Sequence, residues 1–69
     1  MLLKKEKINT FSRCETDYTL FQIENIWIIE CADWQWLDTK QYFFDDETEA
    51  KEAFEIMKNG GWPEELIID

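Results

Sequence analysis

The sequence predicts an α+β fold in which a small antiparallel sheet of three or four strands, a β-meander, packs on one C-terminal helix. The first two-thirds of the chain contain runs of β-branched and aromatic residues separated by short polar segments, a pattern typical of strands and hairpins. The last third contains one segment with apolar residues at helical spacing. With 69 residues and no linker-like tract, the chain is expected to form a single domain, 1–69.

The strands are expected in four segments. Between the second and third of them, the polar pair Glu24-Asn25 predicts a tight hairpin, because Asn tolerates a positive φ. A longer loop from Asp33 to Thr39 is expected before the last strand. The predicted strands are residues 8–12, 18–23, 26–32 and 40–44, of which the first carries the weakest signal.

Residues 47–58 are predicted to form the helix. Asp46 precedes Glu49 by three residues, an arrangement like a capping box, in which the carboxylate accepts from free N–H groups of the first turn. Gly60 stands where a left-handed residue ends a helix, and Pro63 prevents continuation. The residues expected to face the core are Ala50, Ala53, Phe54 and Met57, at spacings i, i+3, i+4 and i+7.

One helix covers only one face of a sheet, yet both faces of the strand at 26–32 are rich in apolar residues. Trp27, Ile29 and Cys31 lie on one side, and Ile26 and Ile28 on the other. Beyond Pro63 we expect a short turn or strand that packs Leu66 and Ile68 against the core, or a short helix. The uncovered apolar surface, with Trp34 or Trp36 in it, is expected to be a self-association face, which makes a homodimer one alternative, or a partner site.

The charge of the chain is strongly negative and excludes several functions. Sixteen acidic residues against seven basic ones, without histidine, give a formal charge of −9. Such a balance argues against direct binding of nucleic acid and against anionic membranes. No apolar run approaches the length of a membrane span, and residues 1–7 lack the apolar core of a signal peptide, so a cytoplasmic location is expected.

Catalysis, a metal site and a cofactor are not expected. The absence of histidine removes the usual base for activating a nucleophile. The acidic run at 45–49 lacks the spacing of a calcium loop and fits the start of a capped helix. Cys14 and Cys31 are predicted to be buried or half-buried structural thiols, with a disulfide between them as the alternative.

The tryptophans are the most informative residues for function. Trp27 and Trp62 are expected in the core or at its edge. Trp34 and Trp36 lie between two strands and are flanked by Asp33 and Asp38, and two interpretations are open. Their rings either close the end of a small core or form an exposed aromatic platform, because Trp is enriched where partners bind.

The segment Phe44-Asp45-Asp46-Glu47-Thr48-Glu49-Ala50 resembles the strand-to-helix junction of three-strand-plus-helix modules common in phage and mobile-element proteins. The resemblance implies the fold only, because those modules often bind DNA through their sheet and the charge here is of the opposite sign. In size and charge the chain is also similar to small phage-encoded antagonists of host nucleases, including anti-CRISPR proteins.

These observations predict a non-enzymatic acidic module that docks on a basic protein surface. In a sharper form, it is an inhibitor that occupies the groove of a nucleic-acid-binding protein and presents carboxylates where phosphates would lie. The first alternative is a globular domain, monomeric or homo-oligomeric, whose acidity serves solubility, and the second is an enzyme or accessory subunit. The expected partner-binding residues are Trp34 and Trp36 as anchors, with Glu15, Asp17, Glu24, Glu30, Asp33 and Asp38 as phosphate surrogates.

Overall fold

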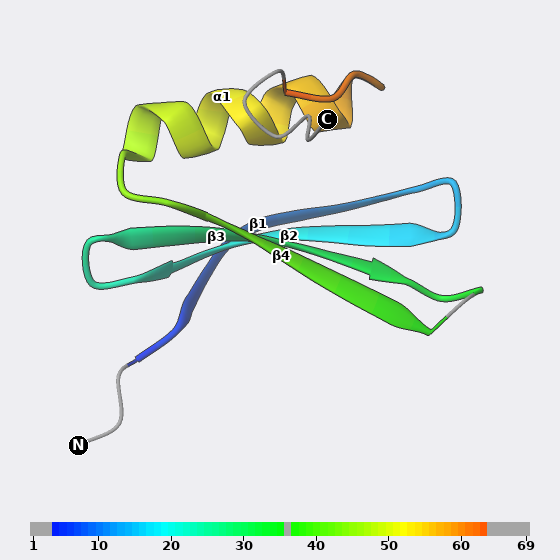
Figure 1. Ribbon diagram of the computed structural model, residues 1–69, viewed down its shortest axis with the longest axis horizontal. Coiled ribbons are helices and arrows are strands. Elements are labelled where there is room, and N and C mark those ends of the chain that lie inside the picture. Colours follow the sequence, from blue (N-terminus) through cyan, green and yellow to red (C-terminus); the bar gives the residue numbers. More distant parts are fainter. Residues whose placement is uncertain (1–3, 36, 64–69) are drawn as a thin grey trace.

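The computed structural model describes residues 4–35 and 37–63, and it confirms the predicted α+β fold. A four-stranded antiparallel sheet has the strand order β1-β2-β3-β4, so each strand pairs with its neighbour in sequence. One helix lies across a single face of this sheet (Figure 1). The elements are β1 (Glu6–Arg13), β2 (Thr16–Ile23), β3 (Ile26–Asp33), β4 (Asp38–Phe44) and α1 (Glu47–Lys58).

The strands extend further than their composition predicts. β2 begins at Thr16, β3 ends at Asp33 and β4 begins at Asp38, so the connection between β3 and β4 is shorter than the expected loop from Asp33 to Thr39. Thr16 pairs with Asp33, and Asp33 pairs in turn with Asp38. The hydrogen-bonded ladder thus continues through polar residues of low strand propensity, because pairing with a neighbouring strand outweighs local preference.

The first two hairpin turns have two residues each and use left-handed backbone at positions other than glycine. Cys14 and Glu15 have φ values of 50° and 63°, as a type I′ turn requires of its two central residues. In the second turn, Glu24 has a φ of 51°. The sequence pointed to Asn25 as the residue that tolerates positive φ, but the turn places this strain on the glutamate before it.

The helix begins and ends where the sequence predicts. The side chain of Asp46 accepts a hydrogen bond of 3.0 Å from the N–H of Glu49, which satisfies one donor of the first turn. At the other end, the N–H groups of Gly60 and Gly61 donate to carbonyls of the last turn at 3.1 and 2.9 Å. With Gly60 at a φ of 93°, these two bonds form a Schellman motif, which only glycine enters without steric cost.

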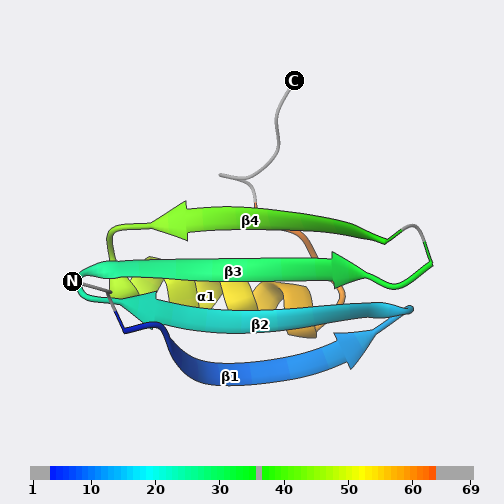
Figure 2. The same ribbon diagram turned by 90° about the horizontal axis from the view of Figure 1, so that it is seen from below.

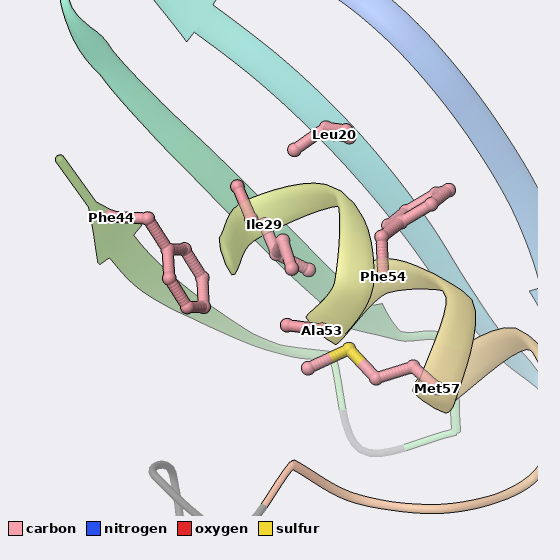
Figure 3. Packing of buried hydrophobic residues seen from close by; sticks show 7 residues of the cluster. Leu20, Ile29, Phe44, Ala53, Phe54 and Met57 are labelled. Atoms are coloured by element: carbon pink, nitrogen blue, oxygen red, sulfur yellow. The ribbon is translucent and has the colours of Figure 1, made fainter. Parts of the chain in front are cut away.

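The core lies between the helix and the sheet, where buried side chains of the two layers point toward one another (Figure 3). Phe11 of the edge strand β1 stacks on Tyr18 at 4.6 Å between ring centroids and meets Phe54 edge-on at 5.0 Å. All four residues of the predicted helix stripe are buried. The buried cluster consists of Leu20, Ile29, Phe44, Ala50, Ala53, Phe54 and Met57.

The opposite face of the sheet has no helix over it within the described residues, as the view onto that face shows (Figure 2). This arrangement agrees with the expectation that one helix leaves one face uncovered. The predictions for Leu66 and Ile68 lie outside the described residues, and so does the prediction for Trp36.

Candidate functional site

Four of the expected binding residues meet at one end of the sheet. Glu15 lies in the turn between β1 and β2, Asp33 ends β3, and Asp38 begins β4 directly opposite Asp33. The N–H of Trp34 donates to the carbonyl of Glu15 at 3.1 Å, which joins the β3–β4 connection to the first turn. Both connections lie at the same end of the sheet in Figures 1 and 2. We call Glu15, Asp33, Trp34 and Asp38 the acidic end.

The connection between β3 and β4 exposes apolar side chains among these carboxylates. Trp34 is 55% exposed, which agrees with the platform interpretation for this tryptophan, and Leu37 is 90% exposed. The N–H of Gln35 donates to the carboxylate of Asp33 at 2.9 Å, so the start of the connection is held in place. An apolar anchor within an anionic rim can bury Trp34 against a partner while the rim attracts positive charge.

A hollow of about 240 Å³ adjoins the acidic end on the helix side of the sheet. Asp33 and Asp38 both line it, and Lys40 adds one positive charge. The rings of Tyr42 and Trp62 meet edge-on at 5.4 Å between centroids. No sequence signal indicated this hollow, because its walls come from three strands and from the segment after the helix. Its lining residues are Thr16, Tyr18, Cys31, Asp33, Asp38, Lys40, Tyr42 and Trp62.

The thiol of Cys31 lies in this hollow and is protonated at neutral pH. Burial raises the pKa of Cys31 to about 11; the ammonium of Lys40 opposes this shift, and the carboxylate of Glu30 adds to it. Burial also raises the pKa of Tyr18, and repulsion from the Cys31 thiolate, once that group ionises, adds to the shift. A thiol with a raised pKa is a poor nucleophile, so Cys31 acts as an apolar wall of the hollow.

The two cysteines differ in their surroundings. Cys31 is half-buried, as predicted, but Cys14 is exposed, so the prediction of a buried or half-buried thiol is wrong for Cys14. The reason is its position in the two-residue turn after β1, beyond the end of the strand ladder. Both thiols are free, and no disulfide joins them.

The other expected phosphate surrogates lie elsewhere. Asp17 accepts a hydrogen bond from the hydroxyl of Ser12 on the uncovered face of the sheet. Glu30, on the same face, pairs with Lys5 at 3.6 Å and accepts from the amide of Gln41 at 2.9 Å. Glu24 lies in the turn between β2 and β3, at the end of the sheet opposite the acidic end. The six acids therefore do not form one surface.

A second concentration of negative charge lies along the helix and in the two residues before it. Residues 45–58 hold six acids against Lys51 and Lys58, a net charge of −4, and one of the acids, Glu47, pairs with Lys51 at 3.1 Å. This charge lies on the layer farthest from the uncovered face of the sheet (Figure 1). The sequence indicated the acids at 45–49 as the start of a capped helix, and one of them, Asp46, is the N-cap.

Two further observations restrict the chemistry of the described part of the chain. Within residues 4–35 and 37–63, no three side chains of His, Cys, Asp or Glu are grouped so that they could hold a metal ion. In the same residues, no helix has the length and apolar character that crossing a membrane requires. Comparisons of the chain with protein-family models, with curated proteins and with solved structures found no match.

Proposed function

We propose that this protein is an acidic binding module that docks its acidic end on a basic surface of another protein. The observation that carries the proposal is that the half-exposed Trp34 shares one end of the sheet with the acidic residues Glu15, Asp33 and Asp38. Aromatic anchors supply much of the affinity of protein interfaces, and surrounding charges speed the encounter with an oppositely charged surface.

The sharper form of the proposal is an inhibitor that occupies a nucleic-acid-binding groove. Paired residues on neighbouring antiparallel strands have Cβ atoms about 5 Å apart, so Asp33 and Asp38 carry two negative charges close together, as the closely spaced phosphates of a nucleic-acid backbone do. The role is binding rather than catalysis in this proposal, and the protonated thiol of Cys31 supports that choice. The proposal includes a cytoplasmic location, which two free thiols support.

The test compares two triple variants that lose the same charge. The site variant carries Glu15→Gln, Asp33→Asn and Asp38→Asn, so the side-chain amide oxygen at position 33 can still accept from the N–H of Gln35. The control variant carries Asp45→Asn, Glu52→Gln and Glu55→Gln, three exposed residues on or just before α1. Each triple variant changes the formal charge from −9 to −6, so a difference between them reports position and not total charge.

Each protein is immobilised and used to capture proteins from a cell lysate at about 50 mM and about 500 mM salt, where screening differs strongly. We expect the wild-type chain and the control variant to retain the same partner at low salt. The site variant should bind that partner at least about tenfold more weakly, because each exposed charge contributes up to about 1 kcal/mol. Equal capture by both variants would contradict docking through the acidic end.

A second step tests the inhibitor form. The captured partner is challenged with a short DNA duplex, and elution by the duplex is expected if both ligands occupy one groove. A partner that stays bound at saturating duplex leaves protein docking intact but contradicts mimicry of nucleic acid. Trp34→Ala should weaken binding at both salt concentrations, because the loss of an apolar anchor is not screened by salt.

A further inference from the structure

The uncovered face of the sheet, which we call the open face, is divided into an apolar and a polar half. Strand register places Phe21, Ile28 and Phe43 in one row across β2, β3 and β4, with Ile23 and Ile26 as a second row beside it. The polar half lies toward the acidic end. Its residues are Thr10, Ser12, Asp17, Thr19, Glu30, Thr39 and Gln41, with Ala32 among them.

The apolar half is exposed, because no helix of the described residues covers it. Phe43 is 64% exposed and Ile26 is 40% exposed, whereas Ile28 is only 6% exposed because its row neighbours stand on both sides of it. The ammonium of Lys5 lies 4.0 Å from the centroid of the Phe21 ring. Exposed apolar patches of this kind on small proteins mark interaction surfaces.

The open face is electrically neutral within a strongly acidic molecule. Its charged residues among those described are Lys5, Lys7, Asp17 and Glu30, and their charges sum to zero, whereas the whole chain carries −9. The acids of α1 and its lead-in lie on the other side of the sheet. A second copy of this chain therefore meets no excess of like charge at the open face, although it would be repelled at the acidic end or at the helix.

We propose that the open face is a homodimer interface, in which a second copy stacks its own open face on the first to form a β-sandwich. Packed sheets lie about 10 Å apart, and a helix adds about 10 Å on each side, so the two acidic helices would be about 30 Å apart. That separation is several times the Debye length of about 8 Å at physiological salt, so the helices repel each other little.

The size of the open face determines how much of it must be buried in the dimer interface. Four strands of seven or eight residues give a footprint of about 500 Å². A stable interface buries about 800 Å² of accessible surface on each partner. A corrugated face exposes more surface than its footprint, so the interface uses both halves. It therefore involves the polar half as well as the apolar rows.

The distribution of residues also selects the symmetry. One possible two-fold axis lies between the two stacked sheets, parallel to the strands and midway between β2 and β3. It places the apolar half of one copy on the apolar half of the other and keeps the strands of the two sheets aligned, as in most β-sandwiches. It also brings Lys7 toward Phe43 of the second copy, which repeats the contact between Lys5 and Phe21. An axis across the strands would instead place Phe43 and Ile26 over the polar half.

This dimer does not depend on the proposed docking function, because it shares no residue with the acidic end. If both hold, the same axis brings the two acidic ends to one side of the dimer. A single dimer would then present two Trp34 side chains to one extended basic surface.

Sedimentation equilibrium of the full chain over a salt series tests the interface. The expected result is a dimer whose affinity increases with salt, because salt screens the repulsion between two chains of −9. The key comparison is Ile26→Glu with Ile56→Glu: the two isoleucines are 40% and 41% exposed, the first on the open face and the second on α1. Phe43→Glu, at the most exposed ring of the face, provides a second variant.

We expect Ile26→Glu and Phe43→Glu to raise the dissociation constant of the dimer by about thirtyfold or more, and Ile56→Glu to change it by less than about threefold. Circular dichroism of each variant identifies any that fails to fold. If Ile26→Glu does not fold, the dissociation constant of Phe43→Glu tests the interface in its place. A wild-type chain that stays monomeric at about 1 mM and at high salt would overturn the proposal. So would a dimer that only Ile56→Glu dissociates.

Discussion

Asp33 and Asp38 face each other across β3 and β4 as the last paired residues of that ladder. Like charges directly opposite one another on neighbouring strands destabilise a sheet. We therefore expect this pair to lower stability at the end of the sheet where the exposed Trp34 lies. This cost is understandable if the pair serves binding, because functional sites often retain unfavourable local arrangements.

The pair leads to a prediction in which stability and binding change in opposite directions. Asp38→Asn should raise the free energy of unfolding by about 0.5 kcal/mol, because the repulsion across the strands disappears while the shape of the side chain is kept. Urea titration at low salt measures the gain, which should shrink as salt is added. The same variant should bind the captured partner more weakly. A loss of stability on this substitution would show that Asp38 has a favourable partner.

The first turn offers a second prediction. Glu15 has a φ of 63° without being glycine, and glycine is the preferred residue at the second central position of a type I′ turn. Glu15→Gly should therefore stabilise the chain by about 1 kcal/mol, because it relieves the left-handed strain. The matched control is Glu15→Ala, which removes the same charge but keeps the Cβ. If alanine and glycine give equal thermal midpoints, charge and not backbone strain determines the cost.

The N-cap supports a third prediction. Asp46→Ala should lower the free energy of unfolding by about 1 kcal/mol, because the N–H of Glu49 loses its acceptor. Asp45→Ala removes the same charge one residue earlier, where the side chain is exposed, and should cost less. Chemical unfolding of both variants at one pH separates the hydrogen bond from the helix dipole. Equal losses would assign the effect to the dipole alone.

The raised pKa of Cys31 predicts how stability changes with pH. Its thiol titrates at about 11 in the folded chain and at its usual value near 9 in the unfolded chain. Because the folded state holds this proton more tightly, the stabilisation is complete below pH 9 and is lost as the pH rises to about 11. The raised pKa of Tyr18 likewise lowers the free energy of unfolding as the pH rises.

Urea titrations from pH 8 to about 11 should therefore show a declining free energy of unfolding, and Cys31→Ala should make the decline less steep. Alkylation gives an independent readout, because iodoacetamide should modify the exposed Cys14 at pH 8 and leave Cys31 unmodified until the chain unfolds. Equal reaction rates for the two thiols would contradict the protection of Cys31.

The helix could be predicted to the residue because its signals are local. A cap three residues from its partner and a glycine after the last turn are visible in the sequence itself. The strand ends could not be predicted in the same way, since Thr16 and Asp38 belong to strands through their pairing with residues of neighbouring strands. Likewise, the positive φ at Glu24 results from the turn type and not from residue preference.

The candidate site could also be predicted only in part from the sequence. The sequence singled out the acids and Trp34 as expected binding residues, but which of them lie together depends on register. Glu15 lies beside Trp34 because the turns at this end of the meander adjoin, whereas Glu24 lies at the other end. The hollow under Trp62 and the exposed Leu37 had no sequence signal, because both depend on how distant segments come together.

The strand order, in which every pair of neighbours in the sheet is also consecutive in sequence, has a consequence for how the chain folds. Each hairpin closes through a connection of only two to four residues, so little loop-closure entropy is lost before strand pairing begins. In the described part of the chain, the contacts that join the most distant segments are those between the helix and the strands. Such a low contact order favours folding within milliseconds, so a freshly synthesised chain exposes its core side chains only briefly before the helix and the sheet bury them.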